Sequence, residues 1–288
     1  MTVSLDVTRP PAALLFEPLV SAALAEDLGR AGDITSQLTI PADKQASAKF
    51  AARKPGRIAG LICAEAAFRL VDPSAKFEVS LPDGSDAAAG AVLATVSGPA
   101  RSILTAERVA LNFLGPLSGT ATATAALVKA VEGTNARIVC TRKTLPGLRA
   151  LQKYAVRCGG GFNHRFGLDD AAMVKDNHVQ AAGGIGPAVA RLRAGLGHMV
   201  RIEVEVDRLE QLVEALALGV DRILLDNMSL DDLRRAVALA KGKAVLEASG
   251  NVTLATVRAI AATGVDYISS GGITHSAPNL DIGLDFQD

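Results

Sequence analysis

The chain has 288 residues, of which 49% are hydrophobic and only 3% aromatic, and its 30 basic side chains balance 30 acidic ones. A net charge of zero argues against a nucleic-acid scaffold and against a polybasic membrane binder. The length suits two modest domains or one large α/β domain with an appendage, and small and branched aliphatic side chains must build the core.

Three cysteines, Cys63, Cys140 and Cys158, show no CxxC spacing and cannot all pair with one another. This pattern predicts reduced, buried thiols in a cytosolic protein rather than a disulfide framework. The N-terminal segment MTVSLDVTRPPAALLFEPL lacks the charged-then-apolar pattern of a signal peptide, and no apolar run approaches the length of a membrane span. We therefore expect a soluble, cytoplasmic protein.

Residues 47–99 alternate short apolar runs with turn sequences. The segment ASAKFAARKPGRIAGLI predicts two strands around Lys54-Pro55-Gly56, and FEVSLPDGSDAAAGAVLATVSG predicts two more around Pro82-Asp83-Gly84. The segment CAEAAFRLV between them suits a helix. Residues 101–133 are helical in composition, with an expected break near Gly115-Pro116 that marks the passage between domains.

After Gly133 the sequence alternates strictly between strand-like and helix-like segments. The predicted strands are ARIVCT, AAMVK, VRIEVEV, DRILLD, KAVLEAS and VDYISS, and the predicted helices between them include PGLRALQKYAV, RLEQLVEALALGV, SLDDLRRAVALA and TLATVRAIAATG. This alternation predicts parallel strands with right-handed crossovers. Six units favour a barrel over an open doubly wound sheet, although the count falls short of eight.

Each predicted strand ends in side chains or turns that can do chemistry. These ends are Arg142-Lys143, Lys175, Glu205, Asp226, Ser249-Gly250 and Ser270-Gly271-Gly272. Because the loops after the carboxyl ends of parallel strands line one mouth of a barrel, we expect these groups to converge on one pocket.

The predicted pocket residues fall into three chemical kinds. Arginine and lysine bind carboxylates and phosphates, and His164 can join them when protonated. An isolated pair of acids, Glu205 and Asp226, suits a hard cation such as Mg²⁺. The turns ASGN and SSGG offer backbone N–H groups to a phosphate.

The run from Thr141 to Leu168 holds six lysines or arginines and no acid. Unbalanced cations in a pocket are costly unless an anion pairs with them, so the missing counter-charge is expected to be the substrate. The glycines Gly159 to Gly161 would let the backbone turn so that His164 and Arg165 point at that anion.

Simpler structural roles compete with each of these assignments. Arg149, Lys153 and Arg157 are spaced four apart and are expected to form a solvated helix face. Glu203 shares a face with Glu205 and would lie deeper in the same pocket or partner a cation. His178 can stabilise a turn as readily as it can act in catalysis, and His198 is expected at the surface.

The segment TRKTLPGLRALQKYAVRCGGGFNHRFGLDDAAMVKDNHV (141–179) resembles the long signature of the quinolinate phosphoribosyltransferase family. The resemblance extends in order from about residue 17 to the C-terminus, through EDLGRAGDITS, LTAERVALNFLGPLSGTAT, EVEVD, ILLDNM, LEASGN and GGITHSAPNLDIGLD. It implies an N-terminal α+β open sandwich (1–118), an incomplete α/β barrel of about seven strands (119–276) and a C-terminal tail (277–288) that packs back on the first domain.

The resemblance also implies a reaction. Such enzymes transfer a phosphoribosyl group from 5-phosphoribosyl-1-pyrophosphate to quinolinate, with Mg²⁺ as cofactor, and release nicotinate mononucleotide, pyrophosphate and CO₂ in NAD biosynthesis. A homodimer is implied, with a hexamer of dimers as a larger alternative, and no nucleic acid or membrane partner.

The site residues implied by the resemblance have distinct roles. Lys143, Glu205 and Asp226 are implied as catalytic residues, and the latter two would hold the metal, largely through substrate and water, and the ribose hydroxyls. The groups that hold the dicarboxylate and the diphosphate are Thr141, Arg142, Lys143, His164, Arg165 and Lys175. Those that surround the 5-phosphate are Ser249, Gly250, Asn251, Ser270, Gly271 and Gly272. Arg108 would reach the pocket of the other subunit, or would be a helix-surface cation.

Three other functions compete with this reading. The first is a related phosphoribosyltransferase or a molybdenum-transport accessory protein, which shares part of the pattern TRK…GGG…HR. The second is a Schiff-base aldolase that uses Lys175 at a strand end. The third is a barrel that binds the phosphoribosyl donor without turnover. The roles of Phe162 and His275 stay open.

Overall fold

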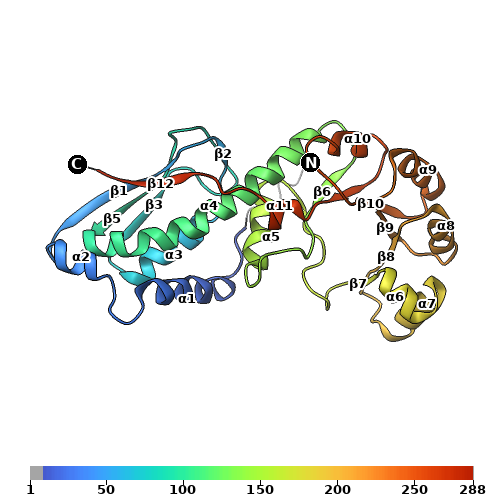
Figure 1. The fold of residues 1–288 in the computed structure, drawn as a ribbon, viewed down its shortest axis with the longest axis horizontal. Helices are drawn as coiled ribbons and strands as arrows, with labels where there is room; N and C mark the ends of the chain where they lie inside the picture. Colours follow the sequence, from blue (N-terminus) through green and yellow to red (C-terminus); the bar gives the residue numbers. More distant parts are fainter. Residues whose placement is uncertain (1–8, 288) are drawn as a thin grey trace. The chain divides into compact units, whose positions relative to one another are not determined.

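The computed structural model describes residues 9–287 of the chain, which form two compact units. The first unit comprises residues 9–125, 145–160 and 276–287, and the second comprises residues 126–144 and 161–275. The chain therefore passes between the units several times (Figure 1). The domain limits expected from the sequence stay predictions.

The first unit is built on a mixed set of short strands and helices. Its four-stranded antiparallel sheet has the order β12-β1-β5-β3. A separate antiparallel pair is formed by β2 and β4. The elements are β1 (Gln45–Ala52), β2 (Gly56–Arg57), β3 (Lys76–Val79), β4 (Asp86–Ala87), β5 (Val92–Pro99), β12 (Ile282–Phe286), η1 (Ala13–Leu15), α1 (Glu17–Leu28), α2 (Ile34–Thr39), α3 (Leu61–Val71), α5 (Arg149–Cys158) and the first part of α4 (Ala100–Ala130).

The core of this unit is small aliphatic with one aromatic cluster. Phe50, Phe68 and Phe77 have ring centroids 5.8 to 5.9 Å apart. Phe50 and Phe68 are almost fully buried. Aromatic rings attract one another in edge-to-face and offset arrangements. The three side chains, from β1, α3 and β3, therefore hold the sheet against the helix that covers it.

A buried aspartate connects the predicted Pro82-Asp83-Gly84 turn to the start of α3. Asp83 accepts hydrogen bonds from the amides of Gly60 and Leu61, at 2.9 and 3.1 Å, and from the Tyr154 hydroxyl at 2.8 Å. The amides at a helix start have no intrahelical partner, so a carboxylate there satisfies them and interacts well with the helix dipole. Burial, the largest influence, raises the pKa of Asp83, and these hydrogen bonds lower it.

The expected break near Gly115-Pro116 is wrong, because α4 is one helix of 31 residues with Pro116 inside it. A proline in a helix interior removes one hydrogen bond and costs about 3 kcal/mol. Here Leu114 and Leu117 on either side are almost fully buried. The Gly115 carbonyl, directly before the proline, accepts a hydrogen bond from the Leu280 amide at 3.1 Å, so the C-terminal segment is bound to the helix at this point. Burial and this tertiary contact offset the cost.

The second unit is a parallel α/β structure. Its six-stranded sheet has the order β6-β11-β10-β9-β8-β7, and every pairing is parallel. The elements are β6 (Arg137–Val139), β7 (Ala172–Val174), α6 (Asp176–Ala182), α7 (Ile185–Gly195), β8 (Ile202–Val206), α8 (Leu209–Ala217), β9 (Arg222–Asp226), α9 (Leu230–Ala240), β10 (Val245–Ser249), α10 (Val257–Ala261), β11 (Tyr267–Ser269) and α11 (Gly272–His275). All six predicted strands are therefore confirmed.

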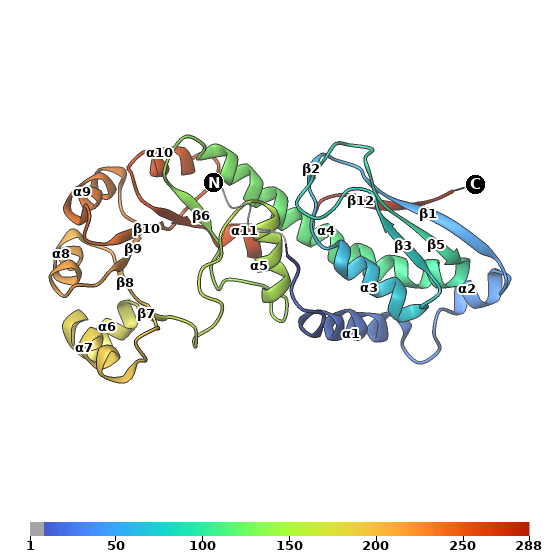
Figure 2. The same cartoon turned by 180° about the vertical axis from the view of Figure 1, so that it is seen from behind.

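The two faces of this sheet have opposite chemistry. The outer face of the sheet is apolar and carries the buried side chains of Val204, Ile223 and Leu225. Helices such as α8 and α9 cover this face and lie outside the strands (Figures 1 and 2). Glu203, Glu205, Asp226 and Glu247 fall on the other parity and line interior cavities. A period of two places every second side chain on one face, so polar residues in otherwise apolar strands all point inward.

The sheet forms an open barrel of six strands, and a single bridged residue lies where a seventh strand would be. Its edge strands β6 and β7 both contribute to one interior cavity through Val139 and Ala172, so the sheet curves around that cavity. Beside β6, Phe162 forms an isolated parallel bridge with Val139. The Phe162 amide donates to the Ile138 carbonyl at 2.8 Å. The barrel therefore has six strands and one bridged residue where the resemblance implied about seven strands.

The bridge also gives Phe162 a structural role. Its half-exposed ring lies 4.9 Å from the guanidinium carbon of Arg137. This is the range of a cation–π contact. The three cysteines are buried and form no disulfide, as predicted. Among the described residues, no helix combines the length and apolarity needed to cross a bilayer.

Candidate active site

All six strands of the barrel contribute to one cavity at their carboxyl ends. The cavity has a volume of about 530 Å³. The convergence expected from the sequence is therefore found for five of the six predicted strand ends, and β11 contributes Ser269 instead of Ser270-Gly271-Gly272. Its lining residues are Thr141, Arg142, Lys143, His164, Arg165, Met173, Lys175, Glu205, Leu224, Asp226, Asn227, Glu247, Ser249, Gly250, Asn251 and Ser269.

Two arginines of the cavity repel each other. Burial lowers the pKa of Arg165 from its usual value, and the charge of Arg142 lowers it further. The Arg165 side chain donates a hydrogen bond to the Ala171 carbonyl at 3.0 Å and makes no salt bridge within the described chain. A pocket that holds two guanidinium groups at close range favours the arrival of an anion.

Lys143 is held by its backbone and extends from the rim. Its amide donates to Thr141 Oγ1 at 2.9 Å, and its carbonyl accepts from Thr274 Oγ1 at 2.7 Å. A Cβ added to Gly271 would lie 2.9 Å from Lys143 Cδ and 3.1 Å from His275 Nε2. Glycine at position 271 therefore lets the lysine and the histidine approach the backbone closely.

The two acids that were predicted to hold a metal lie on neighbouring strands. Glu205 is the penultimate residue of β8, and its Oε2 accepts a hydrogen bond from Lys175 Nζ at 3.0 Å. Asp226 ends β9 and accepts a hydrogen bond from the Asn227 side chain at 2.8 Å. The expectation that the cations lack internal counter-charges is thus wrong for Lys175, because the β7 and β8 ends are adjacent and bring the opposite charges together.

A strained turn forms one wall of the cavity. Asn227 and Asn251, with φ of 53° and 50°, are the non-glycine residues with positive φ in the described part of the chain, and both line this cavity. Gly250 has φ of 101°, and a Cβ there would lie 2.1 Å from Asn227 Oδ1. Backbone strain of this kind concentrates at functional sites, where neighbouring contacts hold it in place.

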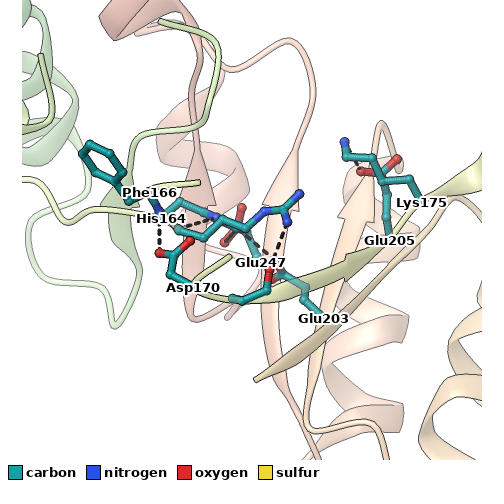
Figure 3. A network of polar contacts seen from close by, with 9 residues as sticks. His164, Phe166, Asp170, Lys175, Glu203, Glu205 and Glu247 are labelled. Atoms are coloured by element: carbon teal, nitrogen blue, oxygen red, sulfur yellow. Dashed lines mark hydrogen bonds and ion pairs between the residues drawn. The ribbon is translucent and has the colours of Figure 1, made fainter. Parts of the chain in front are cut away.

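His164 and Glu247 line the floor of the cavity, and they form a cluster with Glu203, which lines a second cavity inside the barrel. His164 Nε2 lies 2.9 Å from Glu203 Oε2 and 3.6 Å from Glu247 Oε2. Figure 3 shows this cluster apart from the Lys175–Glu205 pair. His164 Nδ1 accepts the Arg165 amide hydrogen at 2.8 Å. The ring therefore carries its hydrogen on Nε2 and donates it to Glu203.

Glu247 is an unusual carboxyl group. Burial, followed by the charge of Glu203, raises its pKa to about 7, and the nearby His164 opposes the shift. Glu247 Oε1 and Ser269 Oγ are both buried, and neither has a hydrogen-bond partner of ordinary geometry among the described residues. Two carboxylates at close range cannot both stay ionised without cost, so a proton is retained between them.

Four predicted residues do not line this cavity. Ser270 is buried and its amide donates to the Val139 carbonyl, so it continues the β11–β6 pairing. Gly271 and Gly272 begin α11 beside Lys143. Arg108 is exposed on α4 within the first unit, where its charge lowers the pKa of Glu107 against a larger effect of burial.

Four cavity residues were missed from the sequence, namely the apolar Met173 and Leu224 and the polar Asn227 and Glu247. Asn227 follows directly after Asp226, and Glu247 lies in the run VLEAS, where an acid interrupts an apolar strand. Acidic side chains are rarely buried without a function or a partner, so the parity that Glu247 shares with Ser249 is the signal that could have found it.

Two of the simpler structural roles were also tested. Lys153 is only 3% exposed, so the solvated helix face expected for Arg149, Lys153 and Arg157 is wrong at its centre. The reason is that α5 packs into the first unit instead of covering the barrel. His178 Nδ1 accepts the Lys175 amide hydrogen at 3.0 Å, so it stabilises the turn before α6, and His198 is exposed as expected.

The donors near the rim fit a hard divalent cation. Glu205 and Asp226 both line the open cavity, and both offer carboxylate oxygens with further lone pairs. Mg²⁺ takes few protein carboxylates and completes its shell with water and ligand oxygens. The donor set at the rim is therefore compatible with a magnesium ion held partly by a phosphorylated ligand.

Comparison with known proteins matches both halves of the chain. A family model described as "Quinolinate phosphoribosyl transferase, N-terminal domain" matches residues 33–118, and one described as "Quinolinate phosphoribosyl transferase, C-terminal domain" matches residues 120–285. A "Probable nicotinate-nucleotide pyrophosphorylase [carboxylating]" of Synechocystis is 48% identical over 96% of this chain and 95% of the relative. The protein of the same name from Bacillus subtilis is 43% identical over 94% and 93% of the two chains.

A solved structure gives the same result in three dimensions. The nicotinate-nucleotide pyrophosphorylase of Francisella tularensis superposes with a TM-score of 0.93 at 42% identity, over 99% of this chain and all of the other. The motifs, both family models and the fold therefore agree. The chain belongs to the quinolinate phosphoribosyltransferase family.

Proposed function

We propose that this chain transfers the phosphoribosyl group of 5-phosphoribosyl-1-pyrophosphate to quinolinate and releases CO₂ and pyrophosphate, in the cavity at the carboxyl ends of the barrel strands. The observation that carries the proposal is the composition of this cavity: cations from β6, β7 and the loop before β7 face acids from β8 and β9. This chemistry matches an acceptor with two carboxylates and a donor with a metal-binding diphosphate.

The arginines suit the acceptor. Quinolinate carries two adjacent carboxylates, and Arg142 and Arg165 would each bind a carboxylate through two parallel hydrogen bonds. His164 lies beside Arg165 and would contact the same end of the pyridine ring. The two guanidinium groups repel each other in the absence of a ligand. A bound dianion would offset this repulsion with its negative charge, which would increase the affinity for quinolinate.

The lysines and acids suit the donor. Lys143 at the rim and Lys175 would neutralise the diphosphate, and Glu205 and Asp226 would hold the ribose hydroxyls and Mg²⁺. A bound Mg²⁺ would supply charge neutralisation at the leaving diphosphate. Release of Lys175 from Glu205 would free one lysine hydrogen-bond donor and one carboxylate for the incoming donor at the same time.

The turn at Ser249-Gly250-Asn251 would hold the 5-phosphate. Its backbone amides and the serine hydroxyl are donors, and the absence of a side chain at Gly250 allows close approach. Ser270, Gly271 and Gly272 would contribute from the adjacent strand end. This end of a barrel is the usual place for a phosphate.

The chemical work of the protein is then positioning and electrostatics. Lys143 and Lys175 would stabilise the departing diphosphate while the ribose carbon becomes cationic and the pyridine nitrogen bonds to it. The positive ring nitrogen would then stabilise the electron pair that the C2–carboxylate bond leaves on C2 as CO₂ departs. This sequence requires no covalent bond between protein and substrate.

The assembly and cellular place of the protein form a separate part of the proposal. We infer a cytoplasmic homodimer in which Arg108 of each subunit serves the cavity of the other. The exposure of Arg108 and its position in the first unit, away in sequence from every cavity residue, support this inference.

The most direct test is an assay of CO₂ evolution from quinolinate labelled at the C2 carboxylate. Evolution should require both the phosphoribosyl donor and Mg²⁺, and it should be matched by an equal amount of pyrophosphate. A panel of pyridine monocarboxylates and other dicarboxylates serves as the control for acceptor identity. Turnover of a monocarboxylate in preference to quinolinate would contradict the proposal.

A further inference from the structure

We propose that Glu247 is the acid that delivers a proton to C2 of the pyridine ring after the carboxylate has left. This inference rests on the proposed decarboxylating reaction in the barrel cavity, and it assigns a step for which the strand-end cations have no suitable group. It concerns a residue that lies two positions before the end of β10, in register with Leu224 as Glu205 is, and that has no part in substrate recognition.

Proton balance makes such an acid necessary. Quinolinate carries a carboxylate on the ring carbon next to nitrogen, and the product carries hydrogen there. When the carbon–carboxylate bond breaks, its electron pair stays on C2 beside the positive nitrogen. A new C–H bond then forms from that pair and one proton, so each turnover consumes a proton at a carbon enclosed by the site. A positioned general acid accelerates such a transfer by about 10²–10⁴-fold.

Glu247 is placed at the base of the cavity. It lies on β10, two residues before Ser249 at the strand end, and its side chain faces the barrel interior. It is 6% exposed. The parallel register places it beside Leu224 and Tyr267, below the level of Asp226. A ring held by its carboxylates among the strand-end cations would therefore lie in the same cavity as this group.

Glu247 also separates two cavities. A second cavity, of about 360 Å³, lies inside the barrel nearer the amino ends of the strands, with Arg201, Glu203, Arg222 and Tyr267 in its lining. Of the residues that the structure describes, His164, Arg165 and Glu247 are the ones that line both cavities. Arg201 is exposed and links the lower cavity to the surface. A proton that Glu247 gives upward can thus be replaced from below without passing the bound substrates.

The surroundings of Glu247 keep it protonated and available. Burial and Glu203 on β8 raise its pKa, whereas His164, the Ser269 hydroxyl and Arg222 lower it to a smaller extent. Its Oε1 makes no hydrogen bond of ordinary geometry within the described chain, so the contact with Ser269 leaves this oxygen accessible to a ligand. When Glu247 has delivered its proton, the carboxylate is left facing Glu203, and this repulsion favours rapid uptake of another proton.

The other candidate donors are less suited. Lys175 would be engaged with the diphosphate in the proposed reaction, and the hydrogen on His164 Nε2 is directed at Glu203. His164 Nδ1 is occupied as an acceptor from the Arg165 amide. Among the groups at the cavity floor, Glu247 alone combines an acidic hydrogen with a free oxygen in the described structure.

The test compares Glu247→Gln with Glu247→Asp and with a matched control, Glu210→Gln, on the exposed side of α8. The kcat for nicotinate mononucleotide should fall by roughly 10²-fold in Glu247→Gln, since the amide has no acidic proton. Quinolinate binding, measured by calorimetry, should stay within about threefold of the native value because the recognition cations are intact. Glu210→Gln should behave as the native protein.

The dependence of kcat on pH distinguishes a proton donor from a residue with a purely structural role. Native kcat should decline above about pH 7 as Glu247 loses its proton. Glu247→Asp should keep that decline at a lower rate, and Glu247→Gln should lose it. Native kcat with an unchanged pH profile in Glu247→Gln would overturn the assignment, as would a loss confined to quinolinate binding.

Two further outcomes are decisive in the same experiment. If Glu247→Gln does not fold, the pH profiles of the native protein and of Glu247→Asp decide, since the absence of a basic decline in both would reject a carboxyl donor. If the native protein does not turn over quinolinate at all, the proposed function fails as a whole. Native turnover together with full activity of Glu247→Gln rejects only the role of Glu247.

Discussion

Lys143 is the clearest single-residue test of the site. It is exposed at the rim, its backbone is held by Thr141 and Thr274, and it makes no salt bridge in the described chain. Lys143→Ala should lower kcat/KM for quinolinate by about 10²-fold or more, because a charge that neutralises the leaving diphosphate is lost. The assay is pyrophosphate release at saturating Mg²⁺.

A matched control for that substitution is Lys241→Ala, which removes an exposed lysine after α9. Its kcat/KM should stay within about twofold of the native value, as expected for an isolated surface charge. Equal activity of both variants and the native protein would show that Lys143 has no part in catalysis.

Glu247 also predicts a dependence of stability on pH. Its folded-state pKa is raised from 4.5 to about 7, so the folded protein binds a proton that the unfolded chain releases across this window. The free energy of unfolding therefore falls as pH rises from about 4.5 to 7. Glu247→Gln should remove this loss, which corresponds to about 1–3 kcal/mol in the free energy of unfolding. The Tm of the variant should therefore exceed that of the native protein at pH 8 by several degrees.

The measurement is the Tm difference between variant and native protein at pH 5 and at pH 8. The difference should become more positive at pH 8, and Glu210→Gln should show the same difference at both values. A difference for Glu247→Gln that did not change with pH would mean that Glu247 is ionised throughout.

At the level of residues, the sequence predicted the rim of the cavity better than its floor. Arg142, Lys143 and Lys175 follow directly after apolar strands, so strand parity and strand ends were sufficient to bring them together. The Lys175–Glu205 pair was not foreseen, because ion pairs between strands depend on register. Glu247 acquires its properties only from Glu203 and His164, which lie on other elements.

At the level of elements, α4 is the part of the chain where local signals failed. Gly115-Pro116 weakens a helix in isolation, but burial and the contact with residues 278–280 keep it continuous. The strands of the barrel were predictable because apolar runs of five or six residues, bounded by turns and helices, have few other solutions. The bridge formed by Phe162 was not predictable, because a single bridged residue leaves no periodic pattern in the sequence.

Packing of α4 against the C-terminal segment leads to a specific substitution. A Cβ at Gly119 would lie 2.1 Å from the Pro278 carbonyl oxygen, a backbone atom that cannot move independently. Gly119→Ala should therefore lower the free energy of unfolding by about 1–3 kcal/mol, even though alanine favours a helix by about 1 kcal/mol. Chemical denaturation followed by circular dichroism measures the change.

Gly115→Ala, one turn earlier in the same helix, is the matched control. Its nearest neighbour would be the Leu280 carbonyl oxygen at 3.3 Å, which requires a shift of only a few tenths of an ångström. This variant should be close to native in stability, since helix propensity compensates for the contact. The prediction fails if Gly119→Ala is as stable as Gly115→Ala.

At the level of the whole molecule, the sequence predicted the order of the two architectures but not the assignment of every segment to them. Residues 145–160 follow β6 in the chain and resemble a crossover helix, yet α5 belongs to the first unit. Its buried face, including Leu151 and Tyr154, joins the core of that unit. An amphipathic pattern specifies that a helix face is buried, and does not specify against which surface.

The inferred dimer gives the last prediction. If Arg108 serves the cavity of the other subunit, then Arg108→Ala and Lys143→Ala damage sites through different subunits. Each variant alone should be nearly inactive, because every site lacks one of the two groups. In a mixed dimer, the barrel that retains Lys143 receives the intact Arg108 of its partner, while the other barrel lacks both groups.

Random reassociation of equal amounts makes half of the dimers mixed, with one intact site of two, so about one quarter of the native activity should return. The experiment unfolds and refolds the two variants separately and together and measures pyrophosphate release. Mixing Arg108→Ala with native protein controls for losses on refolding. If the mixture of variants stays inactive while that control recovers, Arg108 does not act across subunits, because service within its own chain would leave every site of a mixed dimer with one defect.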